Sequence, residues 1–292
     1  MRARPRDDGG RSAKQRALGQ HFLTDASAIE RIFAALDVDP SDHVLEIGPG
    51  AGALTARLVR EAGSVVAVEV DRDLAASLRA QLPDADIVCA DALEVDLGGL
   101  LGRAGKRRRR VVGNLPYNIA SPLILRLFDD DVVAEDMHFM VQAEVARRLA
   151  AAPGSKTYGR LSVIAQWHCH IELLFEVGSG SFSPPPKVRS AFVRLKRRPL
   201  SDRLDCEGTA LDRVVRIAFG QRRKTLANAL KSLPVDWTAL HIDPKDRPEN
   251  LSVAEFVAIA NGLAVVLGPR SDGDNTASEL DSSGALCRVQ AN

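Results

Sequence analysis

The sequence predicts an α/β fold in which helices cover both faces of a mainly parallel sheet, followed by a small all-α C-terminal domain. Short apolar runs alternate with stretches of helical periodicity from residue 44 to about residue 149. Two further apolar runs, at 171–177 and 190–195, predict an antiparallel hairpin that closes the sheet. Every periodic segment after residue 199 is helical, and 292 residues suffice for one sizeable α/β core with a smaller companion domain.

The first expected element is a helix over residues 26–36, because Thr24 and Asp25 precede it and are residue types that cap helix N-termini. Apolar runs predict parallel strands at residues 44–47, 65–69, 86–89 and 111–113. The first of these strands runs into a glycine-rich loop, after which residues 53–61 have helical periodicity.

The second half of the chain adds the hairpin and the helical domain. Helices are expected at residues 161–167, 211–219, 222–230 and 253–263. Residues 1–14 form a basic arm and 269–292 a tail rich in Ser, Asp and Gly, and both are expected to be disordered. The chain between them is divided into two expected domains, 15–198 and 199–268.

The composition is that of an ordinary soluble globular protein, with 45% hydrophobic and 26% charged residues. The four cysteines show no paired spacing, which favours a reducing compartment and argues against a structural zinc. The cluster His168-Cys169-His170 lacks a second ligand pair, so we interpret it as buried residues between a helix and a strand and predict no metal site. Neither a signal peptide nor a membrane span is recognised, and we expect a cytoplasmic protein with no membrane partner.

The glycine-rich loop at 48–52 predicts a cofactor site. Its spacing is Gly-x-Gly-x-Gly, with the acid Glu46 two residues before Gly48, and glycines such as Gly48 and Gly50 let a ligand approach the backbone closely. A nicotinamide-binding protein would instead show Gly-x-Gly-x-x-Gly, which seats a pyrophosphate at a helix N-terminus. The observed spacing suits a ligand with a cationic, phosphate-free end, such as S-adenosylmethionine.

Polar side chains stand at the ends of the next three strands. Glu69 ends the second strand about 20 residues after the glycine loop, where a ribose hydroxyl acceptor is expected. Asp91 follows the third strand and could accept from the adenine amine of the cofactor, and Asn114 follows the fourth. Either acid could also be a helix cap. Because the carboxyl ends of parallel strands meet at one edge of a sheet, the series predicts one shared cavity there.

The tetrapeptide Asn114-Leu115-Pro116-Tyr117 suits the capture of an adenine base. The N6 amine of adenine is a poor nucleophile because its lone pair is delocalised into the ring, so two acceptors must bind its hydrogens. The Asn114 side-chain oxygen is one candidate, and the Leu115 carbonyl, held extended because Pro116 follows, is the other. Tyr117 would stack on the purine once the base has left its helix. The alternative is an ordinary turn that ends a strand.

Phe182 lies just before the proline run 184–186, which fixes the shape of a loop. Phe182 could therefore form a second wall of the base pocket, opposite Tyr117. The alternative is a core phenylalanine in a rigid crossover between strands.

The net charge of +1 is low for a protein that binds nucleic acid, but the basic residues are clustered. They concentrate at residues 106–110, 187–198 and 213–231. The candidates for contact with an RNA backbone are Lys187, Arg222, Arg223 and Lys224, although such a run is often only a solvated face. The run at 106–110 precedes a buried strand and could be no more than a basic loop.

A set of motifs over residues 14–262 resembles the ribosomal RNA adenine N6 dimethyltransferases, and most closely their bacterial branch, which acts on small-subunit (16S) rRNA and whose loss gives kasugamycin resistance. Besides the glycine loop, the matching segments are residues 18–23, 113–119, 140–145, 153–159, 182–188 and 221–225. The set of motifs taken together is highly specific for this family.

The resemblance implies a Rossmann-like class I S-adenosylmethionine-dependent methyltransferase domain at 15–198 and a helical RNA-binding domain at 199–268. It implies N6,N6-dimethylation of two adjacent adenosines in the 3'-terminal hairpin loop of 16S rRNA, during small-subunit biogenesis, by an enzyme that acts as a monomer. The implied cofactor contacts fall on His21, Leu23, Gly48, Gly50, Glu69, Asp91 and Asn114. His21 could instead be a hydrogen-bonded residue that leads into the first helix.

Three other functions stay open. Enzymes of the erythromycin-resistance type modify 23S rRNA on a similar plan, but Leu115, the stretch 153–159 and the region of Arg222 fit the small-subunit enzymes better. A DNA adenine methyltransferase would more usually show two prolines after Asp or Asn, and it would need a duplex-reading domain that the sequence does not suggest. A non-catalytic assembly factor of the ribosomal subunit would use the same surface.

Overall fold

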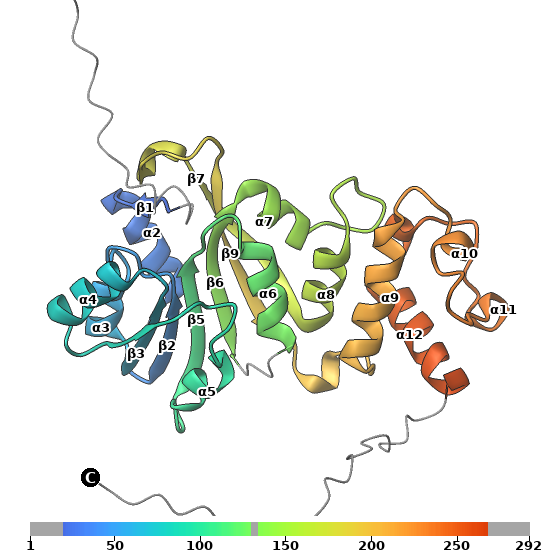
Figure 1. Ribbon diagram of the computed structural model, residues 1–292, viewed down its shortest axis with the longest axis horizontal. Helices are drawn as coiled ribbons and strands as arrows, with labels where there is room; N and C mark the ends of the chain where they lie inside the picture. Colours follow the sequence, from blue (N-terminus) through green and yellow to red (C-terminus); the bar gives the residue numbers. More distant parts are fainter. Residues whose placement is uncertain (1–19, 130–133, 268–292) are drawn as a thin grey trace, which may run out of the picture.

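The computed structural model describes residues 20–129 and 134–267, and Figure 1 shows a central sheet with helices on both sides. The main sheet is built from β2 (Asp42–Ile47), β3 (Ser64–Glu69), β4 (Asp86–Cys89), β5 (Arg108–Asn114), β6 (Asp136–Gln142), β7 (Cys169–Val177) and β9 (Ser190–Arg197). Their order across the sheet is β4-β3-β2-β5-β6-β9-β7. The first five of these are parallel to one another, whereas β9 runs antiparallel to both β6 and β7. The mainly parallel sheet and its antiparallel closing hairpin are therefore confirmed.

Two groups of helices cover the two faces of the sheet. One face packs against α2 (Ala26–Leu36), α3 (Thr55–Glu61) and α4 (Arg72–Gln81), and the other against α5 (Leu97–Gly102), α6 (Ala120–Asp129), α7 (Ala143–Leu149) and α8 (Arg160–His168). In β2, Val44 packs with the first group and Leu45 with the second, because successive side chains of a strand point to opposite faces. All of β2 is buried, as expected for a central strand that is covered on both sides.

The N-terminal part of the fold contains one element that was predicted and one that was not. Helix α2 has the predicted bounds, and Asp25 Oδ1 accepts from the backbone N–H groups of Ser27 (2.9 Å) and Ala28 (3.4 Å), which confirms the N-cap. No local pattern predicted β1 (Phe22–Leu23), which pairs antiparallel with β8 (Phe182–Ser183). Strands of two residues show no periodicity, and this pairing joins distant parts of the chain.

After the sheet the chain forms α9 (Gly208–Gly220), α10 (Leu226–Ala229), α11 (Trp237–Leu240) and α12 (Val253–Leu267). The helices predicted at 211–219 and 253–263 are confirmed inside α9 and α12. The helix predicted at 222–230 is wrong over its first half, because residues 221–224 form a turn. Thr225 is extended (φ −66°, ψ 160°) and begins the single turn of α10. The backbone N–H of Leu226 donates to Asp246 O (2.7 Å), so a contact with a distant loop fixes where this short helix begins.

Several expectations about the limits of the chain have different outcomes. The predicted disordered arm at 1–14 and tail at 269–292 lie outside the described residues. Over 20–129 and 134–267, no helix combines the length and the apolar composition that crossing a bilayer requires.

The expected domain boundary at residue 199 stays a prediction. Helices α9 and α12 share an apolar cluster with α8, so the core is continuous across that position.

A buried ionic network joins the amino-terminal ends of β2, β5 and β6. Arg110, which is 2% exposed, donates to Asp136 Oδ1 (2.7 Å), to Asp42 Oδ2 (3.0 Å) and to the backbone oxygen of Asp37 (3.1 Å). Arg108 adds a bidentate pair with Asp42, at 2.6 and 3.0 Å. The arginines at 108–110 of the basic run thus belong to strand β5, and Arg110 among them is buried, which corrects the interpretation of the whole run as a loop.

The same network determines the protonation of its two aspartates. Burial alone would raise the pKa of Asp42, but hydrogen bonds from Arg108, from the Asp39 backbone and from Arg110 outweigh it and hold the pKa below its ordinary value. For Asp136, burial is again outweighed, by Arg110 and two further neighbours, and its pKa is also lowered. A carboxylate with a lowered pKa stabilises the fold above the pKa of the unfolded chain, and this stability is lost as the pH falls through the folded value.

We expect Asp136→Ala to lower the free energy of unfolding by about 3–5 kcal/mol, because it removes one of the two carboxylates that pair with the buried Arg110 guanidinium. The matched control is Asp86→Ala, which breaks a pair with Arg103 whose side chains are 55% and 52% exposed, and should cost less than about 1 kcal/mol. Urea unfolding at pH 7 measures both values. Equal losses in the two variants would contradict a structural role for the network.

Candidate active site

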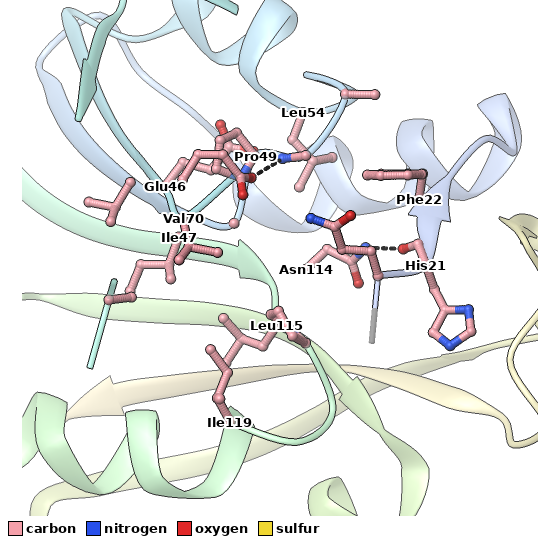
Figure 2. Close-up of a pocket in the computed structure, with 18 of the residues that line it drawn as sticks. His21, Phe22, Glu46, Ile47, Pro49, Leu54, Val70, Asn114, Leu115 and Ile119 are labelled. Atoms are coloured by element: carbon pink, nitrogen blue, oxygen red, sulfur yellow. Dashed lines mark hydrogen bonds between the residues drawn. The ribbon is translucent and has the colours of Figure 1, made fainter. Parts of the chain in front are cut away.

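A pocket opens at the carboxyl ends of β2, β3, β4 and β5, and Figure 2 shows the side chains that line it. Its wall comes from within the segments 46–54, 68–70, 90–92 and 114–119, together with residues 20–23. The predicted convergence of four strand ends on one cavity is therefore confirmed. The predicted site residues that line this pocket are His21, Leu23, Gly48, Gly50, Glu69, Asp91, Asn114, Leu115, Pro116 and Tyr117.

The glycine loop is held against β3 by two hydrogen bonds. Gly48 N donates to Val68 O (3.0 Å), and Gly50 N donates to Glu69 Oε2 (3.0 Å). Gly50 has a φ of +59°, a conformation that side chains rarely adopt, and a Cβ there would lie 2.9 Å from the ring of Phe22. Position 50 therefore requires glycine both for its conformation and for the close approach of β1 to the loop.

Glu69 shapes the pocket as well as lining it. Its Oε2 binds Gly50 N and its Oε1 accepts from Asp71 N (2.9 Å), so one buried carboxylate fixes the loops after both β2 and β3. Burial raises the pKa of Glu69, while the two backbone donors oppose that rise. Each carboxylate oxygen retains a second lone pair, so the predicted role as a ribose hydroxyl acceptor fits this geometry.

Glu46 is a pocket residue that the sequence analysis did not include among the binding residues. It is 1% exposed, and no described residue forms a hydrogen bond with its Oε2. Burial raises the pKa of Glu46 to about 7, with Thr55 acting against the rise and the nearby Glu69 adding to it. A buried carboxylate without a partner is costly, and a cationic ligand in the pocket would remove that cost. The signal was present in the sequence, as an acid two residues before the first glycine.

Asn114 forms the most informative hydrogen bond of the site. Its Nδ2 donates to the backbone oxygen of His21 at 2.9 Å, drawn as a dashed line in Figure 2. A backbone oxygen can only accept, so this bond assigns the donor of the Asn114 amide as Nδ2 and its acceptor as Oδ1. The Asn114 Oδ1 atom is consequently left as the acceptor that the amide can offer to a ligand. Leu115, next in the chain, is anchored by its backbone N–H to Met140 O (3.0 Å).

Tyr117 is held by two residues from other parts of the fold. Its hydroxyl lies 2.7 Å from Ser190 Oγ, and its ring stacks on His21 with centroids 5.4 Å apart. His21 Nδ1 in turn lies 2.7 Å from Pro184 O. His21 is therefore hydrogen-bonded, but it serves the pocket rather than the start of α2, where Asp25 is the cap. No local sequence signal marks Ser190, because its partner Tyr117 lies 73 residues away in the chain.

Asp91 lines the pocket and does not cap a helix, because the N-cap of α5 is Asp96. Its Oδ1 accepts from Leu93 N (2.8 Å), which is a local turn contact, and its side chain lines the pocket. The carboxylate oxygens retain further lone pairs for a ligand. The pair of hydrogen bonds that a cofactor amine would require remains a prediction.

Phe182 lies in the core beside β1. Its ring is 3% exposed and belongs to an apolar cluster with Leu23, Val177 and Phe192. It does not line the pocket, because β8 pairs with β1 and directs the ring into the core. The ring thus occupies the core position that the alternative describes, and a role of Phe182 as the second wall of a base pocket stays a prediction.

The four predicted RNA contacts lie away from the pocket lining. Lys187, Arg223 and Lys224 are exposed, whereas Arg222 donates to Lys156 O (2.6 Å). Part of the Arg222 guanidinium is thus used to join two loops.

In the cluster His168-Cys169-His170, His168 ends α8 and Cys169 begins β7. Both are buried, as the helix-to-strand interpretation predicts, although His170 is exposed.

Comparisons with known proteins agree with this geometry. A model of the family described as "Ribosomal RNA adenine dimethylase" matches residues 11–264. A Nitrosococcus oceani protein named "Ribosomal RNA small subunit methyltransferase A" is 49% identical over 255 residues, which cover 86% of this chain and 96% of the relative. A solved dimethyladenosine transferase from Plasmodium falciparum has a TM-score of 0.70 and 26% identity over 82% of this chain and 96% of its own. The 23S rRNA methyltransferase ErmE has a TM-score of 0.61 and 27% identity over 83% of this chain and 99% of its own.

The matched region includes every pocket residue, from Gln20 to Ile119, and extends through α9 into α12. The two solved structures extend over most of the chain as well, which confirms the class I methyltransferase fold with its helical C-terminal region. The chain therefore belongs to the ribosomal RNA adenine dimethylase family.

Proposed function

We propose that this chain methylates N6 of two adjacent adenosines in the 3'-terminal hairpin loop of 16S rRNA, giving N6,N6-dimethyladenosine during biogenesis of the small ribosomal subunit. As a member of its family it is an S-adenosylmethionine-dependent rRNA adenine dimethyltransferase. The choice of RNA is supported by the small-subunit name of relatives that are 46–49% identical to this chain. The proposal includes a monomer acting in the cytoplasm on the small subunit.

The residues of the pocket fit S-adenosylmethionine. The buried Glu46 Oε2, which lacks a hydrogen-bond partner among the described residues, provides negative charge for a cationic ligand. The glycine loop would accept the ligand against its backbone, and Glu69 and Asp91 would hold its ribose and adenine. When bound, the cofactor supplies a methyl group on a positively charged sulfur.

The orientation of Asn114 is the observation that carries the proposed chemistry. With Nδ2 bound to His21 O, the amide presents an acceptor oxygen, and the Leu115 carbonyl provides a second acceptor next to it in the chain. Two acceptors that bind both hydrogens of an adenine amine draw its nitrogen toward tetrahedral geometry and make its lone pair available. Tyr117 would stack on the purine.

Catalysis by this site is mainly positioning. A base that is already in a loop leaves its stack at a cost of a few kcal/mol, and the acceptors then hold its nitrogen in line for direct transfer. No covalent intermediate with the protein and no strong general base are required. The oxygens of Asn114 and Leu115 also stabilise the positive charge that reaches the nitrogen during transfer.

The proposed RNA substrate is tested by incubation with labelled S-adenosylmethionine and with unmethylated small or large ribosomal subunits in parallel. We expect label in the small subunit, at two adjacent adenosines near the 3' end of 16S rRNA, located by mapping of the modified bases. Label in the large subunit alone would replace the proposal by the activity for which ErmE is named.

We expect Asn114→Ala to reduce methyl transfer roughly 100-fold or more, because an aligned group that acts in the transition state is lost. The matched control is Asn261→Ala, which also removes an amide that donates to a backbone oxygen, Asp205 O (2.8 Å), but on α12. Turnover with small subunits and thermal unfolding are measured for both. Near-normal turnover of Asn114→Ala would refute the role, and retained subunit binding would separate catalysis from an assembly role.

We expect the double change Arg223→Ala with Lys224→Ala to weaken binding to the small subunit and to leave kcat unchanged. Both side chains are exposed, and each lost phosphate contact should reduce the slope of log affinity against log salt by about 1. The control is Lys106→Ala with Arg107→Ala, which removes two exposed charges before β5, at the edge of the sheet opposite the pocket. Identical salt slopes for the two double variants would contradict specific contact by Arg223 and Lys224.

A further inference from the structure

Tyr117 is fixed more firmly than simple stacking on a base would require. Its ring lies against His21, at an interplanar angle of 29°, and its hydroxyl is bonded to Ser190. An aromatic side chain needs only its ring face to stack on a base, so a phenylalanine would present the same face. The hydroxyl and its buried partner therefore have another purpose, which is to hold the ring in one orientation.

Ser190 is well suited to be a fixed attachment point. It is 0% exposed and is the first residue of β9, where it lies in register with Gln142 of β6 on one side and Val177 of β7 on the other. Pairing on both sides leaves its backbone little freedom to move. The Ser190–Tyr117 hydrogen bond thus attaches the end of the Asn114–Tyr117 segment to a strand that is paired on both sides.

His21 supports the ring from the side. Pro184 O can only accept, so His21 Nδ1 must carry the proton in the 2.7 Å contact, and this bond sets the orientation of the imidazole. With His21 on one face of the Tyr117 ring, the opposite face is the one left for a purine. The backbone oxygen of His21 also orients the Asn114 amide. His21 therefore sets the position of the Tyr117 ring and of the Asn114 amide relative to each other.

We propose that Ser190 is a positioning residue for methyl transfer, which acts through the Tyr117 hydroxyl and, together with His21, sets the plane on which the target adenine stacks. This inference rests on the proposed function of the pocket. Ser190, at the start of β9, does not line the pocket. It would nevertheless help to align the adenine N6 that receives the methyl group. Misalignment lowers the rate of a reaction that depends on positioning.

The kinetic test uses Ser190→Ala, Tyr117→Phe and the double variant with unmethylated small subunits. We expect each single change to lower kcat about 3- to 10-fold, the range of one lost hydrogen bond, with little change in the KM for the subunit or for S-adenosylmethionine. If Ser190 acts through the hydroxyl, the double variant will be no slower than Tyr117→Phe alone. Losses that multiply in the double variant would overturn the proposal.

A spectroscopic test needs no substrate and no cofactor. The chain has only two tyrosines, Tyr117 and Tyr158, so protein labelled with ¹³C at tyrosine Cζ gives two signals, which Tyr117→Phe assigns. Ser190→Ala should shift the Tyr117 signal and leave that of Tyr158 in place. An unshifted Tyr117 signal would show that the hydroxyl does not depend on Ser190.

The matched control is Ser162→Ala. Ser162 is also 0% exposed and its hydroxyl donates a hydrogen bond, to Arg148 O, but it lies on α8. We expect this variant to keep both tyrosine signals and its kcat, and thermal unfolding checks that all variants fold. A wild-type chain that methylates small subunits, together with a normal kcat for Ser190→Ala, would reject the inference alone. Failure of the wild type with small subunits would reject the proposed function instead.

Discussion

The hydrogen bond from Asn114 Nδ2 to the backbone oxygen of His21 is the interaction on which the site depends. It joins the end of β5 to the segment that carries β1, and both contribute to the wall of the pocket. Because a backbone oxygen cannot donate, the bond also decides that Asn114 Oδ1 faces a ligand as an acceptor. The His21 ring then supports Tyr117, so the acceptor and the stacking surface are placed by the same residue.

The two edges of the sheet show opposite electrostatics. At the amino-terminal edge, Asp42 and Asp136 are buried with arginines, and their pKa values are lowered. At the carboxyl-terminal edge, burial raises the pKa values of Glu46 and Glu69. The first arrangement stabilises the fold. The second costs stability and leaves negative charge for a cationic ligand, as expected of a binding site.

Local sequence patterns predicted most of the fold and most of the pocket. Apolar runs marked the strands, Asp25 marked the start of α2, and polar residues at successive strand ends marked the cavity, because these signals lie within a few neighbouring residues. Contacts between distant segments were not predictable in this way. The pairing of β1 with β8 directed Phe182 into the core, and a loop contact at Leu226 replaced the first half of a predicted helix. Ser190 was missed for the same reason.

The pocket alone does not select the RNA. An adenine amine presents the same two hydrogens in any ribosomal RNA, and the acceptors beside Tyr117 would bind it in each. The 23S rRNA methyltransferase ErmE shares this fold over 83% of the chain, so a common scaffold serves enzymes named for different RNA substrates. Selection between RNAs must then come from surfaces that contact the backbone and shape of the RNA around the target base. We propose that exposed cations outside the pocket, such as Arg223, Lys224 and Lys187, contribute to that selection.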